Sequence, residues 1–525
     1  MRKNKILLLL MLSVMLILAA CGGKKGDSDS GEGSKSSGEN SAAKRGNSLV
    51  VAIPTDPQSW DPIDTFLLDW SSVGSSIFEG LVDRNLDLDL EPGLAESWEY
   101  EDDLTLRFKL REGVEFHNGE AFNAEAVKFT FDRLLGEEGA KGPQQSNYTS
   151  IESVEVINDY EVVFHLSSPD PVLLTKLAGY GAMIVPPNYV KENTEEFFND
   201  NPVGTGPFKF VDYKRDQFIT LEKNENYWKE DLPKLDEVTF RFIPEASTRL
   251  AELQTGKIDI MKRVEIAQAD TVKDSAHIRL EEVGTPTVMS LRFDDGYDFV
   301  DNKLVRQALN YAVDKEAIID EILDGYGKII STYQSDLSFG NNPDLEPYPY
   351  DPEKAKELLK EARVPEGTEL ELYTPGSDGT FKEIAQIIAF YFEEVGIKLS
   401  IKNADSTTMN SDLIPQGKAG HMYRQGWGGW TLDFDNTAYL MYAEGEFWNP
   451  SFKDDKVQEL LEAERSTVDQ DEREAIFKEL TEVLYELAPE INLYSEVALY
   501  GVNDRVVDFQ PPHEDRIRLE NVSVK

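Results

Sequence analysis

The sequence has one cysteine, Cys21, in 525 residues. With no second thiol the chain can form no internal disulfide, and sites built from several cysteine ligands are excluded. Histidine is scarce as well, and no two histidines are three or four residues apart, as the ligands of a helical metal site are. We therefore expect neither a metal nor a cofactor. The histidines are His117, His165, His277, His421 and His513.

Basic residues are also few, because 53 lysines and arginines face 98 acidic residues and give a formal net charge of -45 at pH 7. Such a chain repels nucleic acid, so we exclude a nucleic-acid partner. The charge favours a well-dispersed monomer. The sequence contains no Gly-x-Ser-x-Gly elbow, His-Glu-x-x-His motif or glycine-rich phosphate loop, so it does not predict an enzyme.

One long apolar run is present, at residues 6–20, and it is too short to span a membrane comfortably. Arg2, Lys3 and Lys5 precede it, which is typical of a signal peptide. The run ends in Leu-Ala-Ala-Cys at residues 18–21 and resembles the lipobox of bacterial lipoproteins, in which the cysteine is lipidated after cleavage. We expect a signal peptide at 1–20, an acyl anchor (palmitate among its chains) at Cys21 and a location on the extracytoplasmic side of the cell membrane.

Residues 21–47 are mostly glycine, serine and charged residues, which predicts a flexible tether with a reach of roughly 25–30 Å. Beyond it, β runs alternate with amphipathic helices. Apolar residues alternate at 104–110 and 161–166 as in half-buried strands, and 48–54 reads as a buried strand. Helical spacing predicts helices at 303–323, 352–362 and 381–395, the last leading through Gly396 into a strand at 397–401. The fold class is mixed α/β.

Several motifs occur in order along the chain. They are Asp61-Pro62, IFEGLV at 77–82, PGLAESW at 92–98, FKLREGVEFHNG at 108–119, PVGTGPF at 202–208, NYW at 226–228 and RQALNYAVDK at 306–315. Together they are similar to the landmarks of extracytoplasmic solute-binding protein family 5, the large substrate-binding lipoproteins of peptide and nickel ABC importers. Asn118 departs from this pattern, because the family usually has aspartate there.

The resemblance implies a type II periplasmic-binding-protein-like clamp of the large, peptide-binding class, with two hinged domains and an extra lobe on the first. Mapped by motif order, the core lobe of domain I comprises 48–82, 199–282 and 492–525. The extra lobe is 83–198, and domain II is 283–491. The hydrophobic pattern agrees with these boundaries but does not define them.

The segment RQGWGGW at 424–430 is the main candidate for ligand binding. Gly426 and Gly428 carry no Cβ and so permit another backbone to approach closely. In peptide-binding relatives the matching segment around Trp427 pairs with the ligand backbone like an added strand. The alternative is a glycine-rich turn held by two tryptophans.

One position of this segment departs from the peptide-binding pattern. Those relatives carry an aspartate three residues after the tryptophan, where it pairs with the ligand's ammonium group, and here Trp430 occupies that position. Asp433 and Asp69 are the substitute candidates, while Trp430 itself offers a stacking platform for a cation or a sugar ring. Arg424 matches an arginine that some relatives place near the ligand carboxylate, and it suits that group because its donors lie in one plane. His421 is a weaker candidate beside the same segment.

These features predict a substrate-binding lipoprotein of an ABC importer that captures small peptides and delivers them to a membrane permease. An oligosaccharide or another amine-free solute is the alternative within the family, favoured by the two tryptophans and the missing aspartate. A secreted hydrolase is the alternative from another class, although the sequence offers neither a nucleophile nor a metal site for it.

Overall fold

The computed structural model describes residues 46–65, 67–376 and 378–525. The predicted signal peptide, Cys21 and nearly all of the predicted tether lie outside the described residues. Within the described ranges, no helix combines the length and apolar character needed to cross a membrane.

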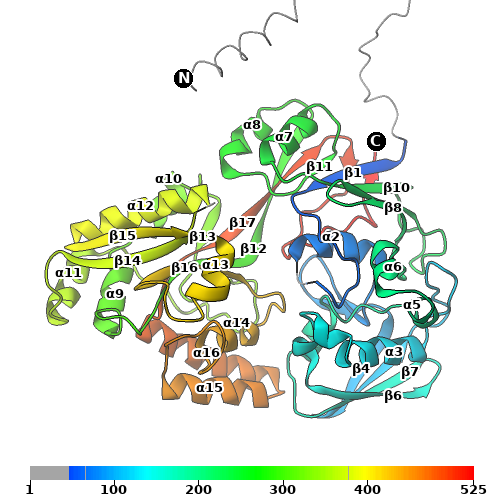
Figure 1. The fold of residues 1–525 in the computed structure, drawn as a ribbon, viewed down its shortest axis with the longest axis horizontal. Helices are drawn as coiled ribbons and strands as arrows, with labels where there is room; N and C mark the ends of the chain where they lie inside the picture. The colour runs from blue at the N-terminus through cyan, green and yellow to red at the C-terminus, as the bar shows by residue number, and fades with distance from the viewer. Residues whose placement is uncertain (1–45, 66, 377) are drawn as a thin grey trace, which may run out of the picture. The chain divides into compact units, whose positions relative to one another are not determined.

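Eleven strands form the main sheet in the described part of the chain, in the order β15-β14-β16-β12-β17-β11-β1-β10-β9-β8, with β13 paired to β17 (Figure 1). Their bounds are β1 (Ser48–Ile53), β8 (Phe208–Lys214), β9 (Phe218–Lys223), β10 (Glu237–Phe242), β11 (Ile260–Met261), β12 (Ile278–Phe293), β13 (Gly327–Ile329), β14 (Thr368–Pro375), β15 (Ile397–Ala404), β16 (Met422–Gly428) and β17 (Glu490–Asn503). The long antiparallel pair β12 and β17 joins one half of the sheet, formed by β14–β16, to the other half, formed by β1 and β8–β11 and called the β1–β10 half below. Its ladder shifts register between Gly284 and Val288.

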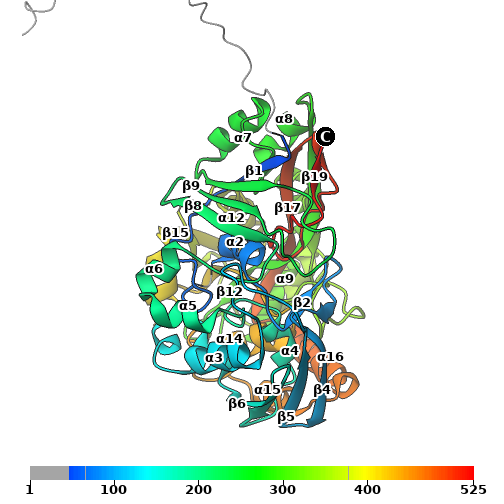
Figure 2. The ribbon, with the colours of Figure 1, turned by 90° about the vertical axis from the view of Figure 1, so that its right-hand side faces the viewer.

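A separate four-stranded antiparallel sheet has the order β4-β5-β7-β6, and helix α3 packs against it (Figure 2). Its strands are β4 (Ala95–Asp102), β5 (Thr105–Leu110), β6 (Ile151–Asn158) and β7 (Glu161–Leu166), with α3 at Ala124–Leu135. Two small ladders pair β2 (Val82–Arg84) with β3 (Leu90–Pro92) and β18 (Val506–Val507) with β19 (Ser523–Val524).

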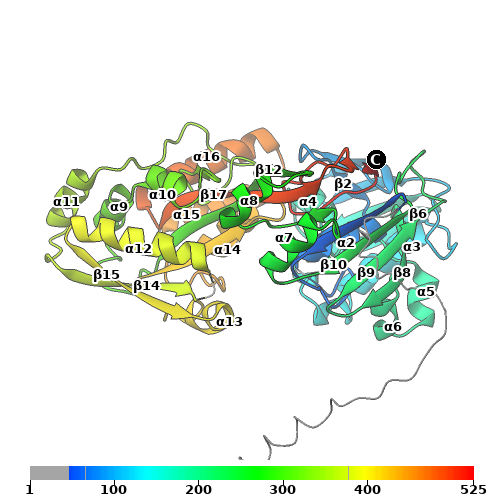
Figure 3. The same cartoon turned by 90° about the horizontal axis from the view of Figure 1, so that it is seen from above.

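The other helices surround the sheets. In the β14–β16 half, α12 packs against β15, and α15 packs against α16 (Figure 3). The bounds are α2 (Leu68–Ile77), α4 (Leu173–Leu177), α5 (Pro187–Glu192), α6 (Glu195–Asp200), α7 (Ala246–Gln254), α8 (Ala269–Lys273), α9 (Lys303–Tyr311), α10 (Lys315–Glu321), α11 (Pro352–Glu361), α12 (Gly379–Glu394), α13 (Ser406–Thr408), α14 (Phe434–Tyr442), α15 (Asp455–Ser466) and α16 (Gln470–Leu487).

The element predictions are confirmed with one exception. Strands β1, β5, β7 and β15 and helices α11 and α12 occur where periodicity placed them, and Asp351 caps α11 by accepting a hydrogen bond from Lys354 N at 2.9 Å. The single helix predicted at 303–323 is wrong, because α9 ends at Tyr311 and α10 begins at Lys315. Asp314 between them has extended backbone and caps α10 by accepting from Ala317 N. An internal N-cap thus divides a continuous amphipathic pattern.

Three of the distant motifs meet around the half-buried carboxylate of Glu79. Glu79 accepts hydrogen bonds from Thr205 Oγ1 at 2.8 Å, Tyr227 Oη at 2.8 Å and Trp228 Nε1 at 3.0 Å. Burial nevertheless raises the pKa of Glu79 to about 6 against the effect of these donors. These motifs therefore join the β1–β10 half of the sheet to the segment that follows α2.

Buried apolar side chains form separate clusters. One lies around β1 and β8–β10, one under the four-stranded sheet and one between β14–β15 and helices α9–α12. The first includes Tyr180, Met183 and Phe198, from the segment assigned to the extra lobe, so the two lobes of the predicted first domain share buried contacts. The domain boundaries themselves stay a prediction.

Candidate functional site

A cleft of about 800 Å³ opens where β12, β16 and β17 approach segments of the other half of the chain. Met289, Gly426 and Tyr494 line it from the central strands. The facing side includes Arg84 and residues 178–180 and 513–516. A cavity of this size is large enough for a small ligand such as a short peptide.

The predicted segment lines this cleft, with Arg424, Gly426, Trp427, Gly428 and Trp430 all in its wall. Strand β16 pairs with β12 along its whole length, from Met422 to Gly428. Strand β14 pairs with β16 at Met422 and Tyr423 alone. In the described part of the chain, the remaining edge of β16 has no second strand beside it, and an unpaired edge of this kind can accept an extended ligand.

The two glycines have a structural role that the sequence did not indicate. A Cβ at Gly426 would lie 2.9 Å from Met289 Sδ, and one at Gly428 would lie 2.7 Å from Thr287 Oγ1. Their small size therefore accommodates side chains of the neighbouring strand β12, which themselves line the cleft. This requirement holds whether or not a ligand is bound.

Trp427 alternates with these glycines and projects to the opposite face of the sheet, as strand periodicity requires. It packs on the cluster of α14–α16, with its ring centroid 6.3 Å from that of Trp448. Its Nε1 is buried and has no hydrogen-bond partner among the residues the structure describes. Most of this side chain therefore belongs to the core, although the residue contributes to the cleft wall.

Trp430 lies between the two sides of the cleft. Its ring stacks on Tyr180 with centroids 6.3 Å apart and planes at 25°, and a Cβ on Gly179 would come within 2.4 Å of the indole. Arg84 donates to the carbonyl oxygens of Trp430 at 3.5 Å and Thr431 at 3.1 Å. The position that carries aspartate in peptide-binding relatives is thus filled here by an aromatic ring that contacts the facing side of the cleft.

Arg424 presents its guanidinium to the cleft with weak protein partners. Nη2 lies 3.4 Å from Asp378 Oδ2, and the group lies 5.6 Å from the ring centroid of Phe381. Its Nε is buried and donates to no acceptor within the described ranges. A buried donor of this kind is costly unless another group satisfies it.

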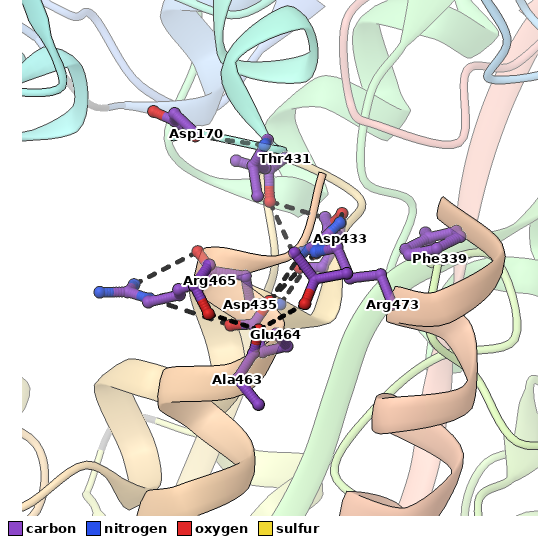
Figure 4. A network of polar contacts seen from close by, with 12 residues as sticks. Asp170, Phe339, Thr431, Asp433, Asp435, Ala463, Glu464, Arg465 and Arg473 are labelled. Atoms are coloured by element: carbon purple, nitrogen blue, oxygen red, sulfur yellow. Dashed lines mark hydrogen bonds and ion pairs between the residues drawn. The ribbon is translucent and has the colours of Figure 1, made fainter. Parts of the chain in front are cut away.

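Asp433 does not line the cleft. Its side chain caps α14 by accepting from Asp435 N, and its carboxylate oxygens accept from Arg473 Nη1 and Nη2, each at 2.7 Å. Glu464 contacts the same arginine at 3.0 Å, and Arg465 pairs with Asp435 (Figure 4). We call these five residues the Asp433 cluster. A carboxylate held in this way is not free to receive a ligand ammonium, contrary to the role the sequence suggested.

Asp69 and His421 also lie outside the cleft lining. Asp69 is buried and accepts from Lys262 Nζ at 2.9 Å and from Thr55 N at 3.1 Å. His421 accepts from Glu371 N at 3.1 Å through Nδ1, and burial lowers its pKa. Both side chains already have protein partners, so neither position supports the ligand contact expected from the sequence.

Charged residues that the motifs did not indicate complete the cleft. Arg84 pairs with Glu514 at 2.7 Å, and Arg263 pairs with Asp515 at 2.8 Å. Glu496, on β17, lies in the same wall. These residues come from segments far apart in sequence and outside any motif, so no local signal could have brought them together. No group of three metal-binding side chains occurs among the described residues.

The chain matches the family model "Bacterial extracellular solute-binding proteins, family 5 Middle" over residues 89–449. It is 30% identical to Heme-binding protein A of Haemophilus influenzae, with 95% of each chain covered. It is 29% identical to the Glutathione-binding protein GsiB of Pectobacterium atrosepticum, with 88% of this chain and 91% of the relative covered.

Solved structures are similar over nearly the whole chain. HbpA2 from Haemophilus parasuis is 27% identical with a TM-score of 0.82, covering 91% of this chain and 100% of its own. The periplasmic binding protein DppA from Helicobacter pylori, in complex with the peptide STSA, is 26% identical with a TM-score of 0.75, covering 91% and 98%.

Proposed function

Because this chain belongs to family 5 of the bacterial extracellular solute-binding proteins, we propose that it captures short peptides and delivers them to an ABC permease. The match to the family model and the similar solved structures confirm the family and the clamp-like α/β fold expected from the sequence. Members are solute-binding components of ABC transporters and not enzymes, so the hydrolase alternative is discarded.

The observation that carries the peptide assignment is the open edge of β16 inside the cleft. Main-chain groups of residues 424–428 on the side away from β12 face no other described strand. A peptide supplies the matching N–H and C=O groups in any sequence, which suits a transporter that accepts varied peptides. An oligosaccharide has no such regular backbone donors.

Charges in the cleft favour the same ligand class. Arg424 has a buried Nε that a ligand carboxylate would satisfy, and the guanidinium can donate two parallel hydrogen bonds to that group. Of the named relatives, GsiB is called a glutathione-binding protein, glutathione being a tripeptide, the DppA structure holds a tetrapeptide, and the Haemophilus influenzae relative is called a heme-binding protein. The aromatic pair Trp430 and Tyr180 keeps an amine-free solute as the second candidate, because it offers a surface on which a sugar ring stacks.

The mechanism we propose is closure of the two predicted domains over the ligand. The only strands that run through both halves of the described sheet are β12 and β17, and their register shift at 284–288 borders the cleft. Ligand that contacts both halves shifts the open–closed equilibrium by its difference in affinity for the two states. The closed form would then dock on the permease.

We further propose that Cys21 carries a lipid anchor that keeps the protein on the outer side of the cell membrane. The support is the signal-like run at 6–20 followed by the lipobox-like sequence at 18–21. A tethered binding protein stays close to its permease at a high effective concentration.

The test is a binding screen of the mature chain by thermal shift and calorimetry. It compares di- to pentapeptides and glutathione with maltotriose and cellotriose, and each peptide with its C-terminally amidated form. We expect micromolar peptide binding, corresponding to about 8 kcal/mol, and weaker binding on amidation because Arg424 loses its carboxylate partner. Binding of the sugars without any peptide would refute the peptide assignment.

A further inference from the structure

Five carboxylates line the cleft, and they differ in whether the protein already neutralises them. Their residues are Glu265, Asp378, Glu496, Glu514 and Asp515. Glu514 lies 2.7 Å from Arg84 and 2.6 Å from Arg516, while Asp515 lies 2.8 Å from Arg263 and 3.1 Å from Lys262. Asp378 faces Arg424 at 3.4 Å. These three acids already have cationic partners and can be satisfied without a ligand.

Glu265 and Glu496 form no ion pair with any described residue. Glu265 is exposed and takes part in the capping box of the short helical turn at 266–268, where its side chain accepts from Gln268 N. Glu496 is half-buried, and no hydrogen bond to its carboxylate occurs within the described ranges. Burial, with Asp378 and Asp515 nearby, raises the pKa of Glu496 against the opposing effect of Arg424 and Arg263.

The strand register places Glu496 on the face that carries the binding segment. Met289 on β12 is opposite Gly426 on one side and Tyr494 on the other. Because side chains alternate along a strand, Tyr494 and Glu496 share the face of Met289, Gly426 and Arg424. Both β17 residues accordingly line the cleft.

We propose that Glu496 receives the cationic amino group of the ligand, in place of the aspartate that Trp430 has displaced. The inference rests on the proposed peptide function and names its second charged contact. Ligand binding would exclude water from the cleft, and a carboxylate buried without a cation is costly, so an ammonium group stabilises this site where a neutral group does not.

The position of Glu496 also bears on ligand size. Arg424 on β16 is opposite Leu291 of β12, whereas Ser495, which precedes Glu496 on β17, is opposite Val288. Two strand spacings and an offset of about four residues along the strands place the backbones of Arg424 and Glu496 roughly 17 Å apart. An extended peptide advances about 3.3–3.6 Å per residue. Because the long arginine and glutamate side chains cover part of this distance, a ligand of a few residues can contact both, whereas a free amino acid carries its two charges on one carbon.

The ammonium group has two possible sources, the peptide N-terminus and a lysine side chain, and the test separates them. Calorimetry uses glutathione, tri-alanine, the N-acetylated form of each, and N-acetyl-Ala-Lys-Ala. The proteins are the mature wild type, Glu496→Gln and Glu282→Gln. Glu282 is an exposed glutamate on β12 outside the cleft lining, so its variant is the matched control.

We expect Glu496→Gln to weaken binding of the free-amine peptides by about 10- to 100-fold, the effect of losing a hydrogen bond between charged groups. N-acetylation should weaken wild-type binding similarly and add little in Glu496→Gln, and Glu282→Gln should behave as wild type. N-acetyl-Ala-Lys-Ala carries its only ammonium group on the lysine. If the wild type binds it as tightly as a free-amine peptide and Glu496→Gln binds it more weakly, Glu496 also receives a side-chain ammonium.

Two results would overturn the inference while leaving the peptide function intact. The first is unchanged affinity of Glu496→Gln for a free-amine peptide that the wild type binds. The second is N-acetylation without effect on the wild type. If the wild type binds no peptide of the screen, the proposed function itself fails and the role of Glu496 fails with it. Glu496→Asp keeps the charge on a shorter side chain and should retain part of the affinity for free-amine peptides. Such binding would show that a substitution at this position leaves the fold intact.

Discussion

Replacing Glu464 by glutamine is expected to remove a pH-dependent loss of stability from the Asp433 cluster. Glu464 Oε2 accepts from Arg473 Nη2 at 3.0 Å and from Nε at 3.1 Å, while both oxygens of Asp433 accept from the same arginine. The side chains of Glu464 and Arg473 are completely buried, at 0% exposure. Any net charge left in this cluster is therefore costly.

The cluster contains three carboxylates and two guanidinium groups, so it is neutral when one carboxylate keeps a proton. Burial raises the pKa of Glu464 well above its usual range, and the negative charge of Asp435 and its hydrogen bond with that group raise it further. Burial acts in the same direction on Asp435, but the hydrogen bond from Glu464 and the charge of Arg465 outweigh it and lower that pKa. We infer that Glu464 is protonated at neutral pH and donates to Asp435.

The effect on stability follows from the sign of this shift. Because the pKa of Glu464 is higher in the folded than in the unfolded chain, folding takes up a proton at pH values between the two. The contribution of protonated Glu464 to the free energy of unfolding is complete below the usual glutamate pKa. Above that pKa it decreases by about 1.4 kcal/mol per pH unit as pH rises. Glutamine offers an N–H to Asp435 and an oxygen to Arg473 at every pH, so its variant should lie within about 1 kcal/mol of wild type near pH 5.

The assay is urea unfolding of both proteins at several pH values, followed by tryptophan fluorescence. Between pH 5.5 and 7.5 the wild type should lose about 3 kcal/mol relative to Glu464→Gln. Glu462→Gln, an exposed substitution on the same helix α15, is the matched control and should follow the wild type. Parallel pH profiles for wild type and Glu464→Gln would refute the protonated state and the charge balance derived from it.

Three further predictions concern other parts of the chain. Folding raises the pKa of Glu79 to about 6, so wild type should lose about 2 kcal/mol relative to Glu79→Gln as pH rises from 4 to 7, and equal slopes in urea unfolding would contradict this. Trp430→Ala should weaken peptide binding by about 1–3 kcal/mol in calorimetry, and ligand should change tryptophan fluorescence; full affinity would show that the indole only packs on Tyr180. Cys21→Ala should release the protein from membranes or leave an uncleaved precursor, and mass spectrometry that finds an unmodified Cys21 on the wild type would exclude the anchor.

Local signals in the sequence predicted much of the fold. Residues 397–401 form a strand after a glycine that ends the preceding helix, and Gly396 has the positive φ of 85° that such a helix end requires. The pattern failed at 303–323, where apolar spacing continued through a helix break. Asp314 was visible in the sequence as a capping residue, but periodicity alone gave it no weight.

The sequence located the binding segment but not the direction of its side chains. Residues 424–430 do line the cleft. Strand alternation alone could have indicated that Trp427 points away from Gly426 and Gly428, and that its ring is therefore mainly a core residue. The contacts of Trp430 with Gly179 and Tyr180 join segments about 250 residues apart, and no local pattern carries that information.

The sequence could not predict which acidic side chain contacts the ligand. With 98 acidic residues, nearness to a motif is weak evidence that a carboxylate serves the ligand, because acids occur throughout the chain. Asp433 is three residues from Trp430, yet its charge is neutralised by Arg473, 40 residues later. Glu496 is far from the motif, yet it lies in the cleft without an ion pair to any described residue. Availability for a ligand depends on which charges the fold leaves unpaired, and that is a property of the tertiary structure.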